Sequence, residues 1–320
     1  MGAAAGLRVR SFCDDESSLE CIAGWNIDCL QLSAGVLDGE AIDLHLPSIQ
    51  LLFEAFRNVS TSHCGTAPGE AVVFGVACSM AGEGRFNSQP WSDGITAFDS
   101  RQELCSVVPP VDLITLVVDR RVLVEHAWVT EHVDLERWLS AGPVVVHDAD
   151  LARRVAGRLL QVRAACKEGS LDAGGTGAQA GLAQEILELL CPLAVHRLRS
   201  PPAPRRERAP VELVRRAREH VHERADEPPR IVDLCRELRV SRRWLQWSFN
   251  EVMGIGPWAY LQLMRLNGAR RMLLRATPQT KVGDAIEAYG FWHMSRFSRD
   301  YRRHFGELPS QTLRRAQARR

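Results

Sequence analysis

An internal repeat in the C-terminal third of the chain constrains the fold more than any other feature of the sequence. Between residues 229 and 309 the same short pattern occurs twice, with an offset of 52 residues. The corresponding positions are Leu245 and Phe297, Phe249 and Tyr301, Gly254 and Gly306, and Pro257 and Pro309. A repeat of this kind indicates two copies of one small unit. In each copy a short segment of helical periodicity, a brief break and a second helical run follow one another, which predicts a helix-turn-helix.

The second helix of each unit has an outward face with the residue types that contact DNA. At about 100° per residue, an inward Leu245 places Phe249 inward too, and the polar and aromatic residues between them outward. The residues predicted to contact DNA are Arg242, Arg243, Gln246, Trp247 and Asn250 in the recognition helix 241–253, and Ser295, Arg296, Arg299, Arg302 and Arg303 in the recognition helix 293–305. Joined by a helical run over 258–274, the two helices could meet major grooves about 34 Å apart.

Three kinds of contact are expected from this surface. The planar guanidinium of Arg299 suits bidentate contact with a guanine, whereas Arg302 and Arg303 are expected to hold phosphates. Trp247 could pack on a thymine methyl or a deoxyribose, or it could cover a surface between domains. A solvated, arginine-rich helical face is the alternative to DNA contact. The equivalent placement of basic residues in both copies favours DNA.

These residues make the chain similar to the AraC/XylS family of transcription regulators. The similarity covers some hundred residues, and the motifs that carry it include Ser241-Arg242-Arg243, Gly256-Pro257 and Pro309-Ser310. It implies an activator that binds double-stranded DNA as a homodimer and works with RNA polymerase. It also implies an N-terminal cupin-like β-barrel that binds a small-molecule effector, followed by helices that form the dimer contact. Trp247 departs from the family pattern, because many members have Arg at this position.

Charge divides the chain into an acidic and a basic part. From Arg205 onward there are 25 basic and 13 acidic residues, whereas the preceding part has 15 basic and 26 acidic ones. The basic part fits phosphate contact with salt-sensitive affinity, and the acidic part is expected to avoid the duplex. A length of 320 residues with 45% hydrophobic composition predicts two domains.

The sequence offers no sign of membrane insertion, metal binding or disulfides. No run of about 18 apolar residues occurs, and residues 1–10 lack the apolar stretch of a signal peptide, so a cytoplasmic location without membrane contact is expected. The nine cysteines are odd in number and include no CxxC pair, and they are interpreted as reduced thiols, mostly in the core. Neither they nor the histidines have the spacing of a metal site, and no metal, cofactor or catalytic residue is predicted.

The pattern along the chain predicts an α+β protein with five segments. The expected divisions are a flexible N-terminus (1–18), a β-rich effector-sensing domain (19–147), a helical hairpin (148–199), a Pro/Arg linker (200–210) and the DNA-binding domain (211–320). The clearest strands are expected at 71–78, 94–98, 104–108 and 111–119. The segment near Pro47 fits a helix or a strand, and the family resemblance favours a strand. The hairpin could form the dimer contact or only cover the barrel.

The effector-sensing domain gives the least specific signals. The segment 74–91 groups aromatic, acidic and glycine residues between strands, as a ligand site or an ordinary hairpin would. The residues predicted to contact an effector are Phe74, Glu83, Trp91 and Phe98. A narrower similarity, carried by Gly290-Phe291-Trp292-His293 and by Gly82-Glu83-Gly84, is to regulators of ethanolamine utilisation. It implies ethanolamine, another amine or acid, or a cobalamin as the effector.

Two other functions are alternatives to the DNA-binding regulator. The first is an enzyme fused to the DNA-binding domain. It would need four clustered cysteine ligands, or a cysteine in a strand-to-helix turn with a histidine beside it, and neither pattern occurs. A regulator controlled by a protein partner in place of a small ligand is the other alternative. The DNA-binding regulator is therefore the favoured interpretation.

Overall fold

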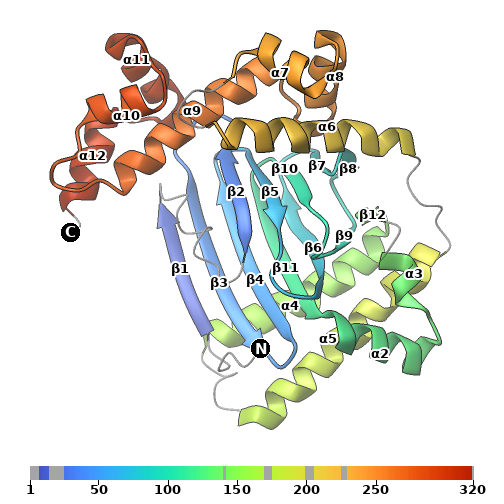
Figure 1. Cartoon of the computed structure of the whole chain (residues 1–320). Helices are drawn as coiled ribbons and strands as arrows, with labels where there is room; N and C mark the ends of the chain where they lie inside the picture. The colour runs from blue at the N-terminus through green and yellow to red at the C-terminus, as the bar shows by residue number, and fades with distance from the viewer. Residues whose placement is uncertain are drawn as a thin grey trace.

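The computed structural model has an N-terminal part of two antiparallel sheets and a C-terminal part of helices, which confirms the predicted α+β class (Figure 1). It describes residues 7–13, 25–139, 142–168, 175–198, 205–224 and 229–318. The strands expected near 71–78, 94–98, 104–108 and 111–119 are all present. The ambiguous segment near Pro47 is a strand. Among the described residues, no helix is long and apolar enough to cross a membrane.

The larger sheet has seven strands and lies between the smaller sheet and the helices that follow it in the chain. In spatial order they are β1 (Leu7–Cys13), β3 (Asp38–Leu46), β4 (Ile49–Arg57), β11 (Val111–Asp119), β6 (Ala71–Met80), β9 (Ile95–Asp99) and β12 (Val144–Val146). The smaller sheet has five, in the order β2 (Asn26–Gln31), β5 (Thr61–Thr66), β10 (Leu104–Val108), β7 (Gly84–Phe86) and β8 (Gln89–Trp91). Apolar side chains of both sheets meet in a shared core between them.

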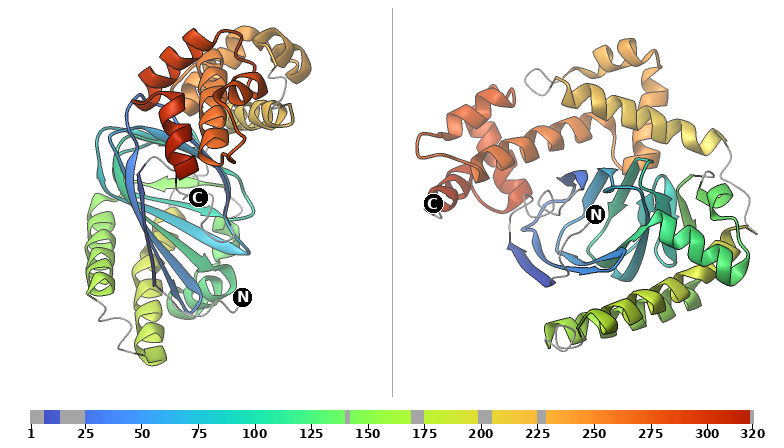
Figure 2. Two further views of the ribbon diagram at one scale, coloured as in Figure 1. Left: turned by 90° about the vertical axis from the view of Figure 1, so that its left-hand side faces the viewer. Right: turned by 60° about the horizontal axis from the view of Figure 1, so that its bottom comes forward.

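Alternation along each strand gives the larger sheet two buried faces. In β4, Leu51 and Phe53 belong to one apolar core, whereas Leu52 and Phe56 belong to the core shared with the smaller sheet. The first core is completed by helices α4 (Ala149–Lys167) and α5 (Gly175–Leu198), which lie along the outer face of the sheet (Figure 2). Asp148 begins α4 by accepting a hydrogen bond from the Leu151 N–H at 2.9 Å.

Three details differ from the expected segments. Residues 7–13, placed in a flexible N-terminus, form β1 and pair with β3 over their whole length, because β3 otherwise has an open edge. The β-rich segment contains two helices, α2 (Arg120–Glu131) and α3 (Leu135–Leu139). The predicted linker 200–210 is wrong in its second half, since helix α6 begins at Arg205 and tolerates Pro210 within it.

The C-terminal domain contains the two predicted units on either side of one long helix. After α6 (Arg205–His222), the first unit consists of α7 (Ile231–Leu238) and α8 (Arg242–Met253). Helix α9 (Pro257–Leu274) leads to the second unit, α10 (Val282–Ala288) and α11 (Met294–Phe305), and α12 (Pro309–Ala318) follows. Both predicted prolines begin a helix, as expected from the preformed φ of this residue. In Figure 1 the two units lie at opposite ends of α9.

Candidate DNA interface and effector cavity

The recognition helices α8 and α11 have the same boundaries relative to the repeat. Helix α8 follows Ser241, whose Oγ accepts a hydrogen bond from the Trp244 N–H at 3.1 Å, and ends at Gly254 with φ 70°. Helix α11 follows His293 and ends at Gly306 with φ 77°. Start and end are each 52 residues apart in sequence. Each C-terminal glycine takes the left-handed conformation that stops a helix. The predicted helices 241–253 and 293–305 therefore have the correct ends and begin one residue early, at the capping residues.

All ten residues predicted to contact DNA are exposed, while the inward positions are buried. Leu245, Phe249, Phe297 and Tyr301 are at most 1% exposed and form the cores of the two units. The exposed set is Arg242, Arg243, Gln246, Trp247, Asn250, Ser295, Arg296, Arg299, Arg302 and Arg303. The polar face of each recognition helix is therefore open to solvent.

The exposed faces of the two units differ in chemistry. On α8 the indole rings of Trp244 and Trp247 stack with their centroids 4.9 Å apart. On α11 Asp300 pairs with Arg296 at 3.7 Å and with Arg303 at 3.6 Å. Within the described part of the chain, Arg299 and Arg302 make no ion pair. Trp244 was not predicted, although its spacing of three residues from Trp247 places both on one helical face.

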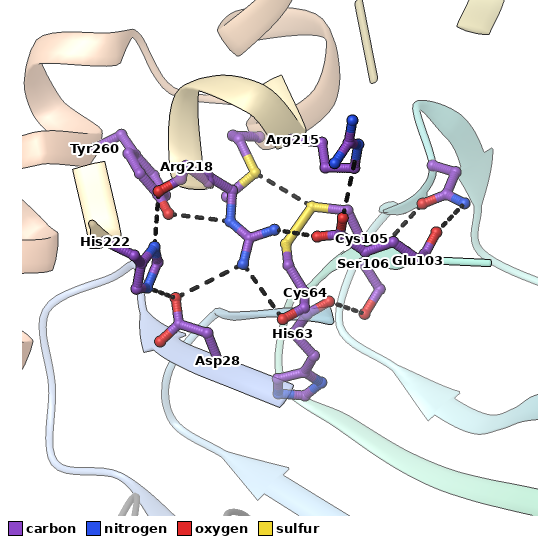
Figure 3. The surroundings of a disulfide bond; sticks show 12 residues. Asp28, His63, Cys64, Glu103, Cys105, Ser106, Arg215, Arg218, His222 and Tyr260 are labelled. Atoms are coloured by element: carbon purple, nitrogen blue, oxygen red, sulfur yellow. Dashed lines mark hydrogen bonds and ion pairs between the residues drawn. A yellow bond between two sulfur atoms is a disulfide. The ribbon is translucent and has the colours of Figure 1, made fainter. Parts of the chain in front are cut away.

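The C-terminal domain is seated on the outer face of the smaller sheet, and Arg218 of α6 is the centre of this contact (Figure 3). Its guanidinium donates to Glu103 Oε1 at 2.7 Å, to the Cys64 carbonyl at 3.3 Å and to the Tyr260 hydroxyl at 3.2 Å. It also lies 3.8 Å from Asp28 Oδ2. Acidic residues of the sensing domain thus pair with the basic C-terminal domain. The numbers of acidic and basic residues in the two parts of the sequence did not predict this contact.

Asp28 of β2 joins three cations at this contact. Its carboxylate lies 3.2 Å from His222 and 3.5 Å from Arg271, besides Arg218. Burial alone would raise the pKa of Asp28, but the His222 hydrogen bond and the nearby cations outweigh it and hold that pKa below its usual value. In turn, the hydrogen bond to Asp28 raises the pKa of His222. The cluster therefore favours ionised partners on both sides.

Two cysteines at the same contact correct the expectation of reduced thiols. Cys64 and Cys105 are bonded to each other, with their Cα atoms 4.1 Å apart. They are directly opposite in the pairing of β5 with β10, where cross-strand side chains come close. The Cys105 sulfur also lies 3.6 Å from the sulfur of Met253 in α8. A separation of 41 residues in sequence gave no indication of this pairing.

The second unit is held by hydrogen bonds around Gln31, the last residue of β2. The side-chain Nε2 of Gln31 donates to the backbone carbonyl of His304 at 3.2 Å, and the backbone carbonyl oxygen of Gln31 lies 3.1 Å from His304 Nε2. Asn267 of α9 contacts both the Gln31 N–H and its carbonyl at 3.2 Å. The Gly35 N–H donates to the same His304 carbonyl at 2.9 Å. Burial lowers the pKa of His304, which favours the neutral ring.

A cavity of about 80 Å³ lies between the two sheets. Its walls are largely aromatic and aliphatic, with a few polar side chains pointing inward. They include Trp25, Ile27, Leu52, Glu54, His63, Val73, Phe86, Trp91, Thr96, Phe98, Leu104, Ser106, Leu113 and Thr115. An apolar enclosure with few convergent polar groups is the usual form of a small-molecule site.

Two titratable side chains border this cavity. Burial raises the pKa of Glu54 to about 7, although Glu54 accepts a hydrogen bond from Thr115 Oγ1 at 3.1 Å. Burial also lowers the pKa of His63 to about 4. The His63 Nε2 and Trp25 Nε1 atoms are buried with no hydrogen-bond partner. Unpartnered buried nitrogens in a roomy site are groups that a ligand can satisfy.

The structure separates the four residues predicted to contact an effector. Trp91 and Phe98 line the cavity. Phe74 points to the opposite face of its strand and packs in the core under α4 and α5. Glu83 is exposed between β6 and β7. Glu54 was missed, although a single carboxylate within the apolar strand Ile49–Arg57 is a signal that sequence reasoning could have used.

The strands of the smaller sheet present one face to the cavity and the other to the C-terminal domain. In β5, His63 lines the cavity and Cys64 contacts Arg218. In β10, Leu104 and Ser106 line the cavity while Cys105, between them, reaches Met253. Cavity and interdomain contact are therefore built from alternate residues of the same strands.

Comparison with known proteins identifies the C-terminal domain. Residues 234–315 match the family profile described as a helix-turn-helix domain. The probable thc operon regulatory protein of Rhodococcus erythropolis is 35% identical over 103 residues, which are 32% of this chain and 31% of that protein. The XylDLEGF operon transcriptional activator 2 of Pseudomonas putida is 38% identical over 77 residues, 23% of this chain and 48% of that protein.

A solved structure resembles a larger part of the chain. The AraC-like transcriptional activator CuxR aligns over 88% of this chain and 100% of its own, with 16% identity and a TM-score of 0.47. The chain spans about a third of the length of the first curated relative and about half of the second. Through its paired helix-turn-helix units, the C-terminal part of this chain is similar to the DNA-binding regulators of the AraC/XylS family.

Proposed function

We propose that the protein is a transcription regulator that reads two successive major grooves with α8 and α11. The observation that carries this proposal is the pair of exposed recognition faces at a constant offset of 52 residues, on units joined by one helix. Residues near the start of a recognition helix meet base edges, and later ones meet phosphates. Arg299 is accordingly assigned to a guanine, and Arg302 to the backbone.

The N-terminal domain is the proposed sensor. The cavity, with its aromatic walls and unpartnered nitrogens, supports binding of a small molecule. A ligand that favours one arrangement of the two domains would change the fraction of molecules able to bind DNA. The name of the Pseudomonas putida relative, a transcriptional activator, supports a role as an activator. Action as a homodimer together with RNA polymerase is part of the same proposal.

The helical hairpin is proposed as the dimer contact in addition to its packing role. Helices α4 and α5 bury apolar faces on the larger sheet, which accounts for the covering role. A cysteine-dependent enzyme receives no support from the described cavity wall, because no cysteine contributes to it.

Footprinting on duplexes selected from a random pool tests the reading of two grooves. Two protected patches one helical turn apart on one side of the DNA are expected, and a single protected half-turn would contradict the proposal. Arg299→Ala should lower affinity for the selected site by about 1–3 kcal/mol and relax preference at one base. Arg153→Ala, an exposed arginine on α4, is the matched control and should bind as the wild type does.

A salt titration tests the assignment of Arg302. Its replacement by Ala should reduce the slope of log affinity against log salt by about one, because one fewer phosphate is neutralised. An unchanged slope would place Arg302 outside the DNA contact.

A further inference from the structure

We propose that the effector is a small organic cation, an ammonium group with a short apolar tail, bound in the cavity between the sheets with its charge held by Glu54. This proposal rests on the sensor role proposed above and narrows it to one class of ligand.

Glu54 is placed as a counter-ion that lacks its cation. It lies on β4 between Phe53 and Ala55, and its side chain borders the cavity. The Thr115 hydroxyl is the hydrogen-bond donor to its carboxylate, and no described Lys or Arg forms an ion pair with it. A carboxylate removed from water is costly unless it is paired. A bound ammonium would supply the missing charge.

The surrounding groups repel an anion and accept a cation. Asp43 on β3 adds negative charge near Glu54 and contributes to the raised pKa of its carboxyl. His63, which faces the cavity from β5, has a lowered pKa and is a neutral ring near pH 7, so it adds no positive charge. Its unpartnered Nε2 can accept a hydrogen bond from an ammonium. The Trp25 indole N–H can donate to an oxygen elsewhere on the ligand.

The remaining wall suits a short apolar tail. The Phe86 ring lies 6.3 Å from that of Trp91 and 5.8 Å from that of Phe98, all three against the cavity. Aromatic faces also attract cations, most strongly when water is excluded. A cavity volume of about 80 Å³ suits a small ligand. Gly75 keeps this space open, since a Cβ there would come within 2.5 Å of Thr96 Oγ1.

Binding of a cation should displace the Glu54 proton. With its pKa near 7, the empty site holds this proton in acid and loses it in base. An ammonium that stays charged over the same range binds the ionised form. Its apparent affinity should therefore fall about tenfold for each pH unit below 7. A neutral ligand of equal size should show no such dependence, and an anion should show the opposite one.

Three probes of equal size test the ligand class on the full chain. Calorimetric titration and thermal unfolding at pH 8 should show binding of n-butylamine, and weaker or absent binding of 1-butanol and butyrate. Glu54→Gln keeps the side-chain shape without the charge and should reduce n-butylamine affinity at least tenfold and remove its pH dependence. Glu131→Gln, which changes an exposed carboxylate at the end of α2, is the matched control and should leave n-butylamine affinity unchanged.

Failure of this inference is distinguishable from failure of the proposed function. Preference for 1-butanol or butyrate, no binding of n-butylamine, or full n-butylamine affinity in Glu54→Gln would each overturn the cation assignment. DNA affinity and footprints are measured separately without any probe, and they decide the regulator function whatever the probes show.

Discussion

The two helix-turn-helix units share one backbone plan but differ in what they present to DNA. With the offset of 52 residues, Trp244 of α8 corresponds to Arg296 of α11, Trp247 to Arg299 and Asn250 to Arg302. The second unit thus offers fixed positive charge and planar donors, whereas the first offers a stacked pair of indoles. In the proposed DNA complex, α11 would supply electrostatic attraction and guanine readout, and the indoles of α8 would supply apolar contact.

The units also differ in how the sensing domain holds them. The first is fixed through an apolar core shared with the smaller sheet, and through the buried Arg218 cluster beside it. The second is fixed by hydrogen bonds around Gln31 and His304. Each of these hydrogen bonds contributes a net of about 1 kcal/mol, and together they are expected to contribute less than the apolar core and the buried guanidinium that hold the first unit. The second unit is therefore the one that a change in the sensor can release more easily.

The largest expected effect comes from breaking the attachment of the first unit. Arg218→Ala leaves Glu103 and Asp28 without their buried partner and should cost about 3–5 kcal/mol in the free energy of unfolding. Chemical denaturation of the full chain measures it. Arg216→Ala, an exposed arginine on the same helix, is the control and should change stability by less than about 0.5 kcal/mol. Equal effects of the two substitutions would remove Arg218 from the attachment.

A smaller effect should follow from breaking the attachment of the second unit. Gln31→Ala removes the amide that binds the His304 carbonyl and should cost about 1–3 kcal/mol of local stability. Hydrogen exchange should become faster in α11 while α8 keeps its protection, which separates the two attachments. Gln184→Ala on the exposed face of α5 is the control. Equal loss of protection in both helices would contradict the difference described above.

The chemistry of the first recognition face is tested at Trp247. Trp247→Ala should weaken binding to the selected site by about 1 kcal/mol without changing its salt slope, because the lost contact is apolar. Trp247→Arg should copy the second unit and steepen the slope by about one. Trp128→Ala, an indole exposed on α2, is the control. A DNA affinity unaffected by either substitution of Trp247 would place this residue off the DNA.

The smallest expected effect is a change with pH. The pKa of His222 is raised, so its contact with Asp28 contributes fully below the unfolded value near 6.5 and is lost as the pH rises through the raised pKa. The pKa of His304 is lowered, so its contribution is present above about 6.5 and is lost as the pH falls. Moving from pH 7.5 to 5.5 should therefore loosen α11 relative to α6. Hydrogen exchange at both pH values measures this, and faster exchange in α6 alone would reverse the assignment.

Sequence reasoning reached furthest where the fold depends on local pattern. Ser241, Gly254 and Gly306 set the ends of the recognition helices through capping and backbone conformation, which neighbouring residues determine. The exposed DNA faces follow from helical periodicity around Leu245 and Phe297. For the same reason, the buried strands β6, β9, β10 and β11 could be located from short apolar runs bounded by turn residues.

It reached least where distant segments meet. Cys64 and Cys105, Asp28 and Arg218, and Gln31 and His304 are brought together only by sheet pairing and by the seating of one domain on the other. Phe74 was assigned to the effector because strand patterns do not state which buried face of a two-faced sheet encloses the cavity. For the same reason, the sequence did not show that Glu54 faces the cavity.

The alternation of residues along β5 and β10 has a consequence for how such a regulator can diversify. In the proposed sensor, substitution of His63 or Ser106 would change the ligand preference, while Cys64 and Cys105, one position away, keep their contacts with α6 and α8. Ligand preference and the contact with the C-terminal domain could therefore change independently during evolution, because they depend on opposite faces of the smaller sheet.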